Sequence, residues 1–305
     1  MKLRTLLRWM PVAAGGLALM DAAAIEPARL KVGRLTVPVD RGGDGLVGLR
    51  LAHLSDLHVG GTGWRSATLA KAVDACNRES VDLIALTGDF ISKASHVPAA
   101  LDLLSILRTD VPRLAVFGNH DHVYGRRPME QLASGLADLG IVVLRNEGLR
   151  LRLRDGAVWF VGVDDGYSER DDLERAERQL ETDGSPRILL THYPDVADRL
   201  LPGQYQLSLA GHSHGGQIRL PILDEIVSYR HARTRYTRGL YMVNGNPLHV
   251  SPGLGMSALP LRLFNLPEVT ILTFEPVEET PAPSNSAEEG LRSPLLLPEP
   301  PFPRH

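Results

Sequence analysis

The chain has 305 residues, of which 43% are hydrophobic and 23% are charged, enough for one enzyme domain with a sizeable core. Its formal net charge of -3 gives no basic footprint for nucleic acid. A single cysteine, Cys76, excludes an intramolecular disulfide framework and lies in an amphipathic helical pattern that predicts burial.

The first residues have the pattern of a targeting segment. Three basic residues precede an apolar stretch at 9–20: Lys2, Arg4 and Arg8. The stretch is shorter than the roughly 18 residues of a membrane-spanning helix, and Ala22-x-Ala24 offers a cleavage site. We expect residues 1–24 to be either a cleaved signal peptide or a retained membrane anchor. Both alternatives predict a location at the cell envelope, exported or membrane-associated.

Strand and helix patterns then alternate along the chain. Short apolar runs predict strands at 49–54, 81–87, 114–117 and 141–144, with a helix at 67–78. Two later stretches have hairpin signals. They are 149–154 with 157–163 around Asp155-Gly156, and 240–243 with 248–251 around Asn244-Gly245-Asn246. The pattern predicts an α/β fold of two packed sheets with helices outside.

The end of the chain changes character. Residues 276–305 are rich in Pro, Glu and Ser, cannot bury enough apolar area to fold, and are expected to be disordered. No internal repeat or second domain is apparent. We therefore predict one domain at 25–275 between the targeting segment at 1–24 and this tail.

Five short polar blocks carry the chemistry, and each directly follows a strand-like apolar run. In chain order they are Asp56-Leu57-His58, Gly88-Asp89, Gly118-Asn119-His120-Asp121, His192 and Gly211-His212-Ser213-His214. Strands that end at one sheet edge would gather these side chains into one dinuclear metal site.

Two divalent cations suit hydrolysis of phosphate esters, because they offset the repulsion between an anionic ester and its nucleophile and also generate hydroxide. A carboxylate must bridge such a pair, and Asp89 is the candidate because it ends a strand-like run. Gly88 before it permits a tight turn beneath the metals. Within Asp56-x-His58 and His212-x-His214, an extended chain would point both side chains the same way, although both pairs could instead lie on turns.

The ordered blocks resemble the calcineurin-like metallophosphoesterase superfamily over about residues 53–217. The resemblance implies a four-layer α/β/β/α sandwich with the metals at the strand ends. It places Asp56, His58 and His214 on one metal, Asn119, His192 and His212 on the other, and Asp89 between them. His120 would be the catalytic histidine, and Asp121, where many relatives have glutamate, would orient its ring.

Metal identity follows in part from the ligand types. Carboxylate, imidazole and amide groups without thiolate favour manganese, zinc or iron over copper(I) or an iron–sulfur cluster. We expect two divalent ions, manganese or zinc in an isolated sample.

The other histidines have simpler interpretations. His53 is expected to pack in the core, whereas His96, His231 and His305 fall in polar segments and are expected to be solvated. For His122, which follows the Asn119 block, pocket lining and a structural role are equally favoured. His249 is left open, and a lone histidine such as His192 would be structural more often than not without its place in the ordered set.

The metal site would recognise the phosphate, and the loops around it would determine which substrate binds. The segment 229–236 with Arg238 concentrates guanidinium groups that could bind a second phosphate or form a solvated face. Residues 254–266 are apolar and could be core or dip into a membrane.

Phrases such as Leu261-Arg262-Leu263-Phe264-Asn265 resemble bacterial membrane-associated phosphodiesterases, some of which hydrolyse the pyrophosphate of UDP-2,3-diacylglucosamine. Three hypotheses follow. The first is an envelope phosphodiesterase or pyrophosphatase, with a lipid-linked substrate and contact with a membrane surface. The second is a broad phosphomonoesterase, and the third is a scaffold that binds protein partners.

Overall fold

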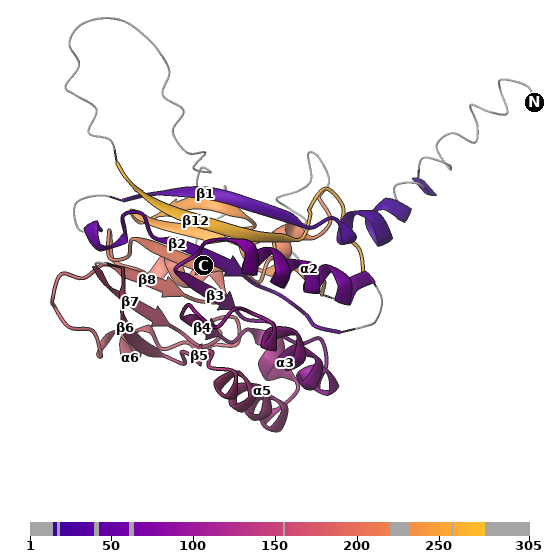
Figure 1. Cartoon of the computed structure of the whole chain (residues 1–305), viewed down its shortest axis with the longest axis horizontal. Coiled ribbons are helices and arrows are strands. Elements are labelled where there is room, and N and C mark those ends of the chain that lie inside the picture. The colour runs from indigo at the N-terminus through magenta and orange to yellow at the C-terminus, as the bar shows by residue number, and fades with distance from the viewer. Residues whose placement is uncertain are drawn as a thin grey trace, which may run out of the picture.

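The computed structural model describes residues 15–16, 19–39, 43–60, 64–154, 156–219, 232–257 and 259–277. Twelve strands in these segments form two six-stranded mixed sheets that pack face to face (Figure 1). The expected architecture of two packed sheets with helices outside is confirmed.

The first sheet has the order β1-β12-β2-β3-β4-β5. Its strands are β1 (Lys31–Val39), β12 (Glu268–Pro276), β2 (Arg50–Leu54), β3 (Leu83–Thr87), β4 (Arg113–Val116) and β5 (Val142–Val143). Strands β2 to β5 run parallel, and β12 lies antiparallel to β2 and parallel to β1. The first and last strands of the domain are therefore neighbours, a pairing that the apolar runs did not predict.

The second sheet has the order β10-β11-β9-β8-β7-β6. Its strands are β6 (Glu147–Leu153), β7 (Gly156–Gly162), β8 (Arg187–Leu190), β9 (Leu207–Ala210), β10 (Gly239–Val243) and β11 (Asn246–Val250). Both predicted hairpins are present as the antiparallel pairs β6–β7 and β10–β11. The turn between β10 and β11 has positive φ at Asn244 and Gly245, the conformation for which an Asn-Gly pair is suited.

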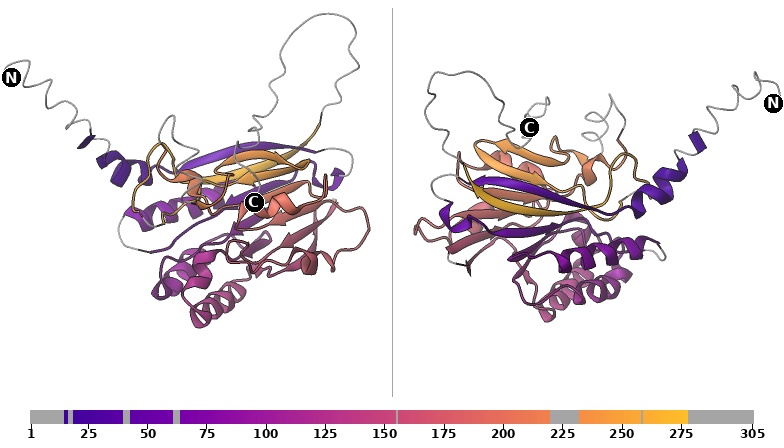
Figure 2. Two further views of the ribbon diagram at one scale, coloured as in Figure 1. Left: turned by 180° about the vertical axis from the view of Figure 1, so that it is seen from behind. Right: turned by 45° about the horizontal axis from the view of Figure 1, so that its top comes forward.

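Helices cover the outer faces of both sheets. The longer ones are α2 (Trp64–Arg78), α3 (Val97–Ser105) and α5 (Arg126–Asp138), and the shorter ones are α4 (Asn119–Val123) and α6 (Leu173–Glu177). Single-turn helices complete the set: η1 (Asp21–Ile25), η2 (Glu26–Ala28), η3 (Asp44–Leu46), η4 (Ala94–His96), η5 (Pro194–Arg199) and η6 (His214–Gly216). Figure 2 shows α2, α3 and α5 together on one side of the body.

Three buried apolar clusters correspond to the spaces between these layers. One lies between the first sheet and α2, α3 and α5, one between the two sheets, and one between the second sheet and α6 with η5. Cys76 is fully buried in the first cluster, as expected. These layers are those of a four-layer α/β/β/α sandwich.

Among the described residues, no helix is both long and apolar enough to cross a membrane. Most of the predicted targeting segment, and the whole tail after residue 277, lie outside the described residues.

Candidate metal centre

The five polar blocks converge at one edge of the sandwich, where carboxyl ends of strands from both sheets meet. Asp56 and His58 follow β2, Asp89 follows β3, and Asn119 begins α4 directly after β4. From the second sheet, His192 follows β8, and the pair of His212 and His214 follows β9. Strand order along the chain is thereby converted into proximity in space, as the sequence predicted.

One half of the site is a compact cluster in which Asp56, His58, Asp89 and His214 each offer a ligand atom within 4.8 Å of the others. The Nε2 atoms of His58 and His214 are 3.0 Å apart. Oδ2 of Asp89 lies 3.2 Å from His58 Nε2, and Oδ1 of Asp56 lies 3.4 Å from His214 Nε2. All four residues are buried, so their polar atoms face one another rather than solvent.

The other half begins at the same Asp89 carboxylate, whose Oδ2 is 3.4 Å from Nε2 of His192. Nδ1 of His212 lies 3.0 Å from Oδ1 of Asn119, and the rings of His192 and His212 meet edge to face at 5.2 Å. Asp89 therefore lies between two groups of ligand-type atoms. The structure brings all seven predicted metal ligands to one place.

Backbone contacts fix which ring nitrogen faces the centre. Nδ1 of His192 lies 2.7 Å from the Thr87 carbonyl, and Nε2 of His212 lies 2.9 Å from the Ala232 carbonyl. A carbonyl can only accept, so each of these nitrogens carries the proton. In the neutral form of each ring, the opposite nitrogen has the free lone pair that binds a metal.

Backbone strain is concentrated at this centre. Five candidate ligands have left-handed backbone conformations with φ between 43° and 70°: Asp56, His58, Asp89, His212 and His214. Both pairs, Asp56 with His58 and His212 with His214, therefore lie on turns rather than on extended chain. Such conformations cost on the order of 1–3 kcal/mol each and persist only where surrounding contacts hold them. Functional sites are where such strain gathers.

Glycines allow the two loops below Asp89 to touch. Gly88 has φ +84°, and a Cβ there would lie 2.5 Å from the Gly118 backbone nitrogen. A Cβ on Gly118 would in turn lie 2.3 Å from Oδ1 of Asp89. The tight turn predicted at Gly88 is therefore present, and the close approach lets the Asp89 carboxylate accept the His120 backbone N–H at 2.8 Å.

The pKa shifts reflect burial and charge pairing. Burial alone would raise the pKa of Asp89, but His192 and His58 lower it well below its usual range. Burial opposes protonation of His192, yet Asp89 and Asp56 raise its pKa to about 10. Burial lowers the pKa of His214 and of His212, the latter to about 3. The ionised Asp89 and the neutral His212 and His214 are in the state that a divalent cation needs, whereas His192 must release a proton when a cation binds.

The residues present fit a pair of metal ions. Nε2 of His192, which faces the Asp89 carboxylate, is buried without a hydrogen-bond partner. A protein interior seldom leaves a buried polar atom unpaired, and a metal bound between these groups would explain it. The donor set has carboxylate, imidazole and amide groups and no thiolate, as manganese, zinc or iron sites do.

Asp121 does not orient the His120 ring. Its buried carboxylate instead accepts backbone N–H groups of Asp89, Phe90 and Gly118 at 2.9, 2.9 and 3.0 Å. Burial and the adjacent Asp89 charge raise the pKa of Asp121 to about 7. The carboxylate therefore holds together the loops that carry Asp89 and Asn119. Its position next to His120 in the sequence had suggested a contact with the His120 ring instead.

The other described histidines either make structural contacts or line the pocket. His53 is buried as predicted, and its Nδ1 lies 2.9 Å from Nδ1 of His249, which the sequence left open. His122 has a structural contact, with Nε2 2.6 Å from Asp164. His96 was expected to be solvated, but it is half-buried and lines the cavity beside the centre. His231 and His305 lie outside the described residues.

The arginine segment is only in part a solvated face. Arg235 is buried, donates to Asp198 at 2.5 Å and stacks on the Tyr236 ring. Arg238 donates to Asn265 at 3.2 Å. Arg233 is exposed, and residues 229–231 lie outside the described residues. Two of the described guanidinium groups, those of Arg235 and Arg238, therefore serve contacts within the protein.

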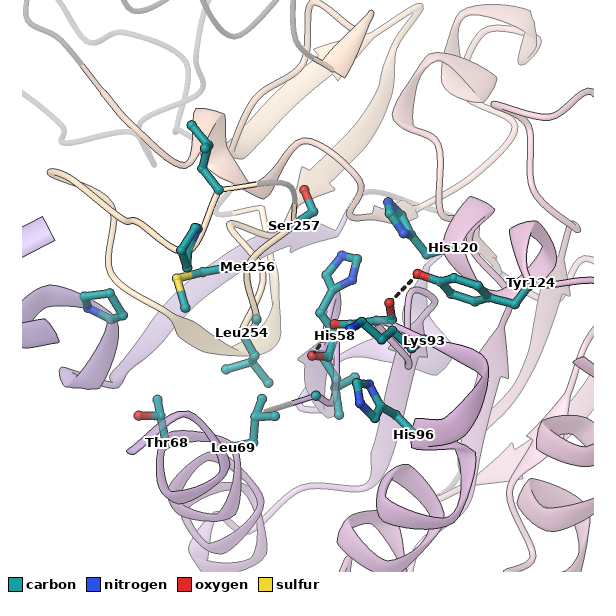
Figure 3. A pocket seen from close by; sticks show the side chains of 17 residues that line it. His58, Thr68, Leu69, Lys93, His96, His120, Tyr124, Leu254, Met256 and Ser257 are labelled. Carbon is teal, nitrogen blue, oxygen red and sulfur yellow. Dashed lines mark hydrogen bonds between the residues drawn. The ribbon is translucent and has the colours of Figure 1, made fainter. Parts of the chain in front are cut away.

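A cavity of about 530 Å³ opens beside the first half of the centre (Figure 3). His58 and His120 lie at the metal side, together with Lys93, His96 and Tyr124. The opposite wall is apolar and is formed by Pro27, Leu57, Leu69, Leu254, Met256, Leu259 and Pro260. Figure 3 shows Leu69, Leu254 and Met256 across the cavity from His120 and Tyr124.

Sequence reasoning missed several residues of this pocket and its surroundings. Lys93 and Tyr124 follow the Asp89 and Asn119 blocks closely, and that proximity was the available signal. Tyr193 directly follows His192, and its ring meets His212 edge to face at 5.1 Å. Tyr167 also lies against His212, with ring centres 4.8 Å apart, and nothing in its local sequence indicates this.

The family model for calcineurin-like phosphoesterases matches residues 49–216, more than half of the chain. The chain belongs to this family. Its calcineurin-like domain spans every polar block of the centre, and a dinuclear divalent metal site is what the family leads us to expect.

Curated relatives carry the same family description. Two metallophosphoesterases of Bacillus subtilis, YkoQ and YkuE, are each 32% identical to the chain. The matches cover 73% of this chain and 82% of YkoQ, and 83% of this chain and 88% of YkuE. Phosphodiesterase YaeI of Escherichia coli is 30% identical over 75% of this chain and 83% of its own.

Solved structures align over most of the chain at low identity. A dimetal phosphatase from Danio rerio is 14% identical, with 70% of this chain and 90% of that one covered and a TM-score of 0.40. The phosphopantetheinyl hydrolase of Mycobacterium tuberculosis is also 14% identical, with 72% and 96% covered and a TM-score of 0.43.

Proposed function

We propose that this metallophosphoesterase is a phosphodiesterase or pyrophosphatase of the cell envelope whose substrate carries an apolar group. The candidate substrate class is a nucleotide-linked lipid. The observation that carries this proposal is the cavity beside the metal centre, which is polar at His58 and His120 and apolar at its far wall.

The geometry supports the ligand assignment that the family resemblance implies. We assign Asp56, His58 and His214 to one divalent ion, Asn119, His192 and His212 to the other, and Asp89 to both. When bound, the two ions would neutralise phosphate charge and lower the pKa of the attacking water. The neighbouring imidazoles keep Asp89 ionised, and burial keeps His212 and His214 neutral, so these three ligands are in their binding forms. His192 would give up a proton to a metal, because Asp89 and Asp56 raise its pKa to about 10.

His120 is the proposed general acid. Its backbone N–H is anchored on Asp89, its ring meets the His58 ring edge to face at 4.8 Å, and its side chain lines the cavity. An imidazole there can donate a proton to a leaving oxygen. Burial lowers the pKa of His120, so the protonated form is held less strongly than in a free histidine.

The cavity lining supports a diester over a monoester. A phosphomonoester has one substituent, whereas the lining has an apolar part with Met256 and Leu259 and a polar part with Lys93 and His96, which suit two different substituents. Lys93 and His96 at the polar side suit another anionic group such as a second phosphate. A relative described as a phosphodiesterase, YaeI, points in the same direction.

Exposed apolar residues near the cavity mouth support contact with a membrane surface. Leu259 is 55% exposed and Phe264 is 63% exposed, and the helical turns before β1 expose Leu19, Met20 and Ile25. The apolar sequence at 9–20 leads directly into these turns. An apolar substrate group could then pass from lipid to the cavity without crossing water.

The test is hydrolysis of bis-p-nitrophenyl phosphate and p-nitrophenyl phosphate by chelator-stripped protein, with manganese, zinc, iron or no metal added. We expect metal-dependent cleavage with the diester preferred. A preference for the monoester would replace the proposal by a broad phosphomonoesterase. Inactivity with every metal, in protein that binds metal, would favour the scaffold hypothesis.

Lipid selectivity needs a second comparison. A short-chain nucleotide diphosphate ester and its long-chain counterpart should be presented in the same detergent micelles. We expect a lower KM for the long-chain ester, and Met256→Gln and Leu259→Gln should remove that difference while leaving bis-p-nitrophenyl phosphate cleavage intact. Equal KM values for both chain lengths would contradict the apolar substrate class.

A further inference from the structure

The N-terminal turns are fastened to the apolar segment that borders the cavity. Glu26, in η2, is buried, and its two carboxylate oxygens accept the backbone N–H groups of Phe264, at 2.8 Å, and Asn265. The backbone N–H of Arg262 donates to the carbonyl of Ala22 at 2.8 Å. One carboxylate thus binds two successive amides of a segment 238 residues further along the chain.

The amides that Glu26 binds belong to a strained turn. Phe264 has φ +54°, a left-handed conformation that is uncommon for an aromatic residue, and its side chain is 63% exposed. Packing of the side chain therefore contributes little to keeping that conformation. The hydrogen bonds that the Phe264 and Asn265 amides donate to the Glu26 carboxylate fall on the strained residue itself and help to hold its conformation.

Asn265 transmits this restraint to the metal centre. Its buried side chain donates from Nδ2 to the carbonyl oxygen of His214 and accepts from Arg238 at 3.2 Å. The same side chain lies against Gly215, where a Cβ would be only 2.7 Å from Oδ1. The His214 carbonyl also accepts the backbone N–H of Gln217 at 2.9 Å, and His214 has φ +50°. The bond from Asn265 is therefore one of two that hold this strained peptide, and the one that comes from outside its own turn.

Arg262 reinforces the segment from inside. Its fully buried guanidinium donates to the carbonyls of Pro252, Gly253 and Gly255 at 3.0, 2.9 and 2.6 Å. Gly255 in turn donates its N–H to the Asp56 carbonyl at 2.6 Å. The segment held by Glu26 is therefore in contact with the backbone of two candidate ligands, Asp56 and His214.

From these contacts, we propose that Glu26 is a positioning residue for the metal centre: it fixes the turn at Phe264 and Asn265, and Asn265 fixes the peptide of His214. The proposal rests on the proposed ligand role of His214. A segment before the first strand would then set the affinity of the site for metal, although it contributes no ligand.

The test compares Glu26→Gln with Glu79→Gln in the full chain. Glu79 is a matched control because its carboxylate also accepts two donors, Arg34 and Arg50, but neither lies in the loops of the metal centre. Cobalt(II) is titrated into chelator-stripped protein, and affinity and the visible spectrum are recorded together with the melting temperature. We expect E26Q to bind one cobalt ion about tenfold more weakly with an altered spectrum, and E79Q to match wild type.

A rescue variant separates positioning from general destabilisation. Glycine adopts positive φ without strain, so Phe264→Gly should make the turn less dependent on Glu26. In that background we expect E26Q to weaken cobalt binding by less than about threefold. An equal loss in both backgrounds, or an E26Q protein that melts earlier but binds cobalt as E79Q does, would overturn the proposal.

If E26Q does not accumulate as folded protein, Asn265→Asp tests the same link. It retains the acceptor for Arg238 but places an acceptor opposite the His214 carbonyl, and unchanged cobalt affinity would refute the positioning role. Failure of wild type to bind two ions would instead contradict the proposed function.

Discussion

At the residue scale, the centre depends on side chains whose backbone is held in unfavourable conformations. Asp56, His58, Asp89 and His214 all have positive φ. Backbone hydrogen bonds hold these conformations: Asp56 donates to the Gly88 carbonyl, His58 donates to the Asp89 carbonyl, and the His214 carbonyl accepts from Gln217. The ligand atoms are therefore positioned before any metal binds. Some residues of the centre are proposed to hold metal and others to act on substrate. Two substitutions distinguish these two roles.

His120→Ala should keep both metals and lose most turnover, because general acid–base help contributes roughly 10² to 10⁴ in rate. Asp89→Asn should instead lose metal, because it removes the charge shared by both halves of the site. Metal content by elemental analysis and kcat on bis-p-nitrophenyl phosphate distinguish the two. Wild-type turnover in the His120 variant would remove that histidine from its proposed role.

Gly88→Ala should lower the free energy of unfolding by about 2–4 kcal/mol, because left-handed alanine is strained and its Cβ would meet the Gly118 backbone. Gly184→Ala is the matched control: φ is +75°, and nothing lies within 4 Å of the added Cβ. It should cost about 1 kcal/mol. Urea denaturation measures both, and similar losses would mean that the contact with Gly118 is unimportant.

At the element scale, the sequence predicted strands and hairpins well where apolar runs were bounded by strong turn residues. The Asn244-Gly245 turn and the runs that became β2, β3 and β8 are examples. Strand β1 was missed because its burial alternates irregularly and its partner β12 is 237 residues away, at Lys31 and Glu268. Long-range pairing leaves little trace in local pattern.

The ligand set could be predicted because each ligand directly follows a strand-like run, which fixes its sheet edge. The roles of Asp121 and Glu26 could not. Asp121 binds backbone amides that only the packed loops bring together, and Glu26 binds a segment at the other end of the domain. Neither contact involves residues that are close in sequence or distinctive in type.

Truncation tests the contribution of the N-terminal turns as an element. Removal of residues 1–24 leaves Glu26 in place, whereas removal of residues 1–28 takes it away but spares β1, which begins at Lys31. We expect the shorter truncation to retain metal affinity within about threefold of wild type and the longer one to lose about tenfold or more. Cobalt titration measures this, and indistinguishable truncations would contradict the expectation.

At the scale of the whole molecule, a buried histidine pair joins the two sheets. His53 on β2 and His249 on β11 face each other through their Nδ1 atoms, and Nε2 of His53 lies 2.8 Å from Thr87 Oγ1. Burial lowers the pKa of His249 to about 3. Burial also lowers the pKa of His53, and the neighbouring His249 lowers it further. Both imidazoles are therefore neutral in the folded protein and become protonated only when it unfolds.

The sign of the pH dependence follows. Between pH 6.5 and about 3, the unfolded chain binds a proton at His249 that the folded chain does not, so stability falls as pH falls. From pH 7 to pH 5 this amounts to about 2 kcal/mol. His249→Asn keeps a polar group toward His53 but has no titrating imidazole at this position. Between pH 7 and pH 5, its free energy of unfolding should fall by about 2 kcal/mol less than that of wild type, as measured by urea denaturation of metal-free protein. Parallel pH dependences would exclude His249 as a contributor.

The position of β12 between β1 and β2 also determines when the protein can fold. β1 is synthesised first, yet among the described strands its neighbour in the sheet is β12, at residues 268–276. Until β12 has been synthesised, β1 has no partner strand, and β2 has no neighbour on the side that β12 later occupies. The first sheet must therefore be completed after synthesis of the domain, and a chain that stops before residue 268 should remain unfolded and exposed to proteases and chaperones.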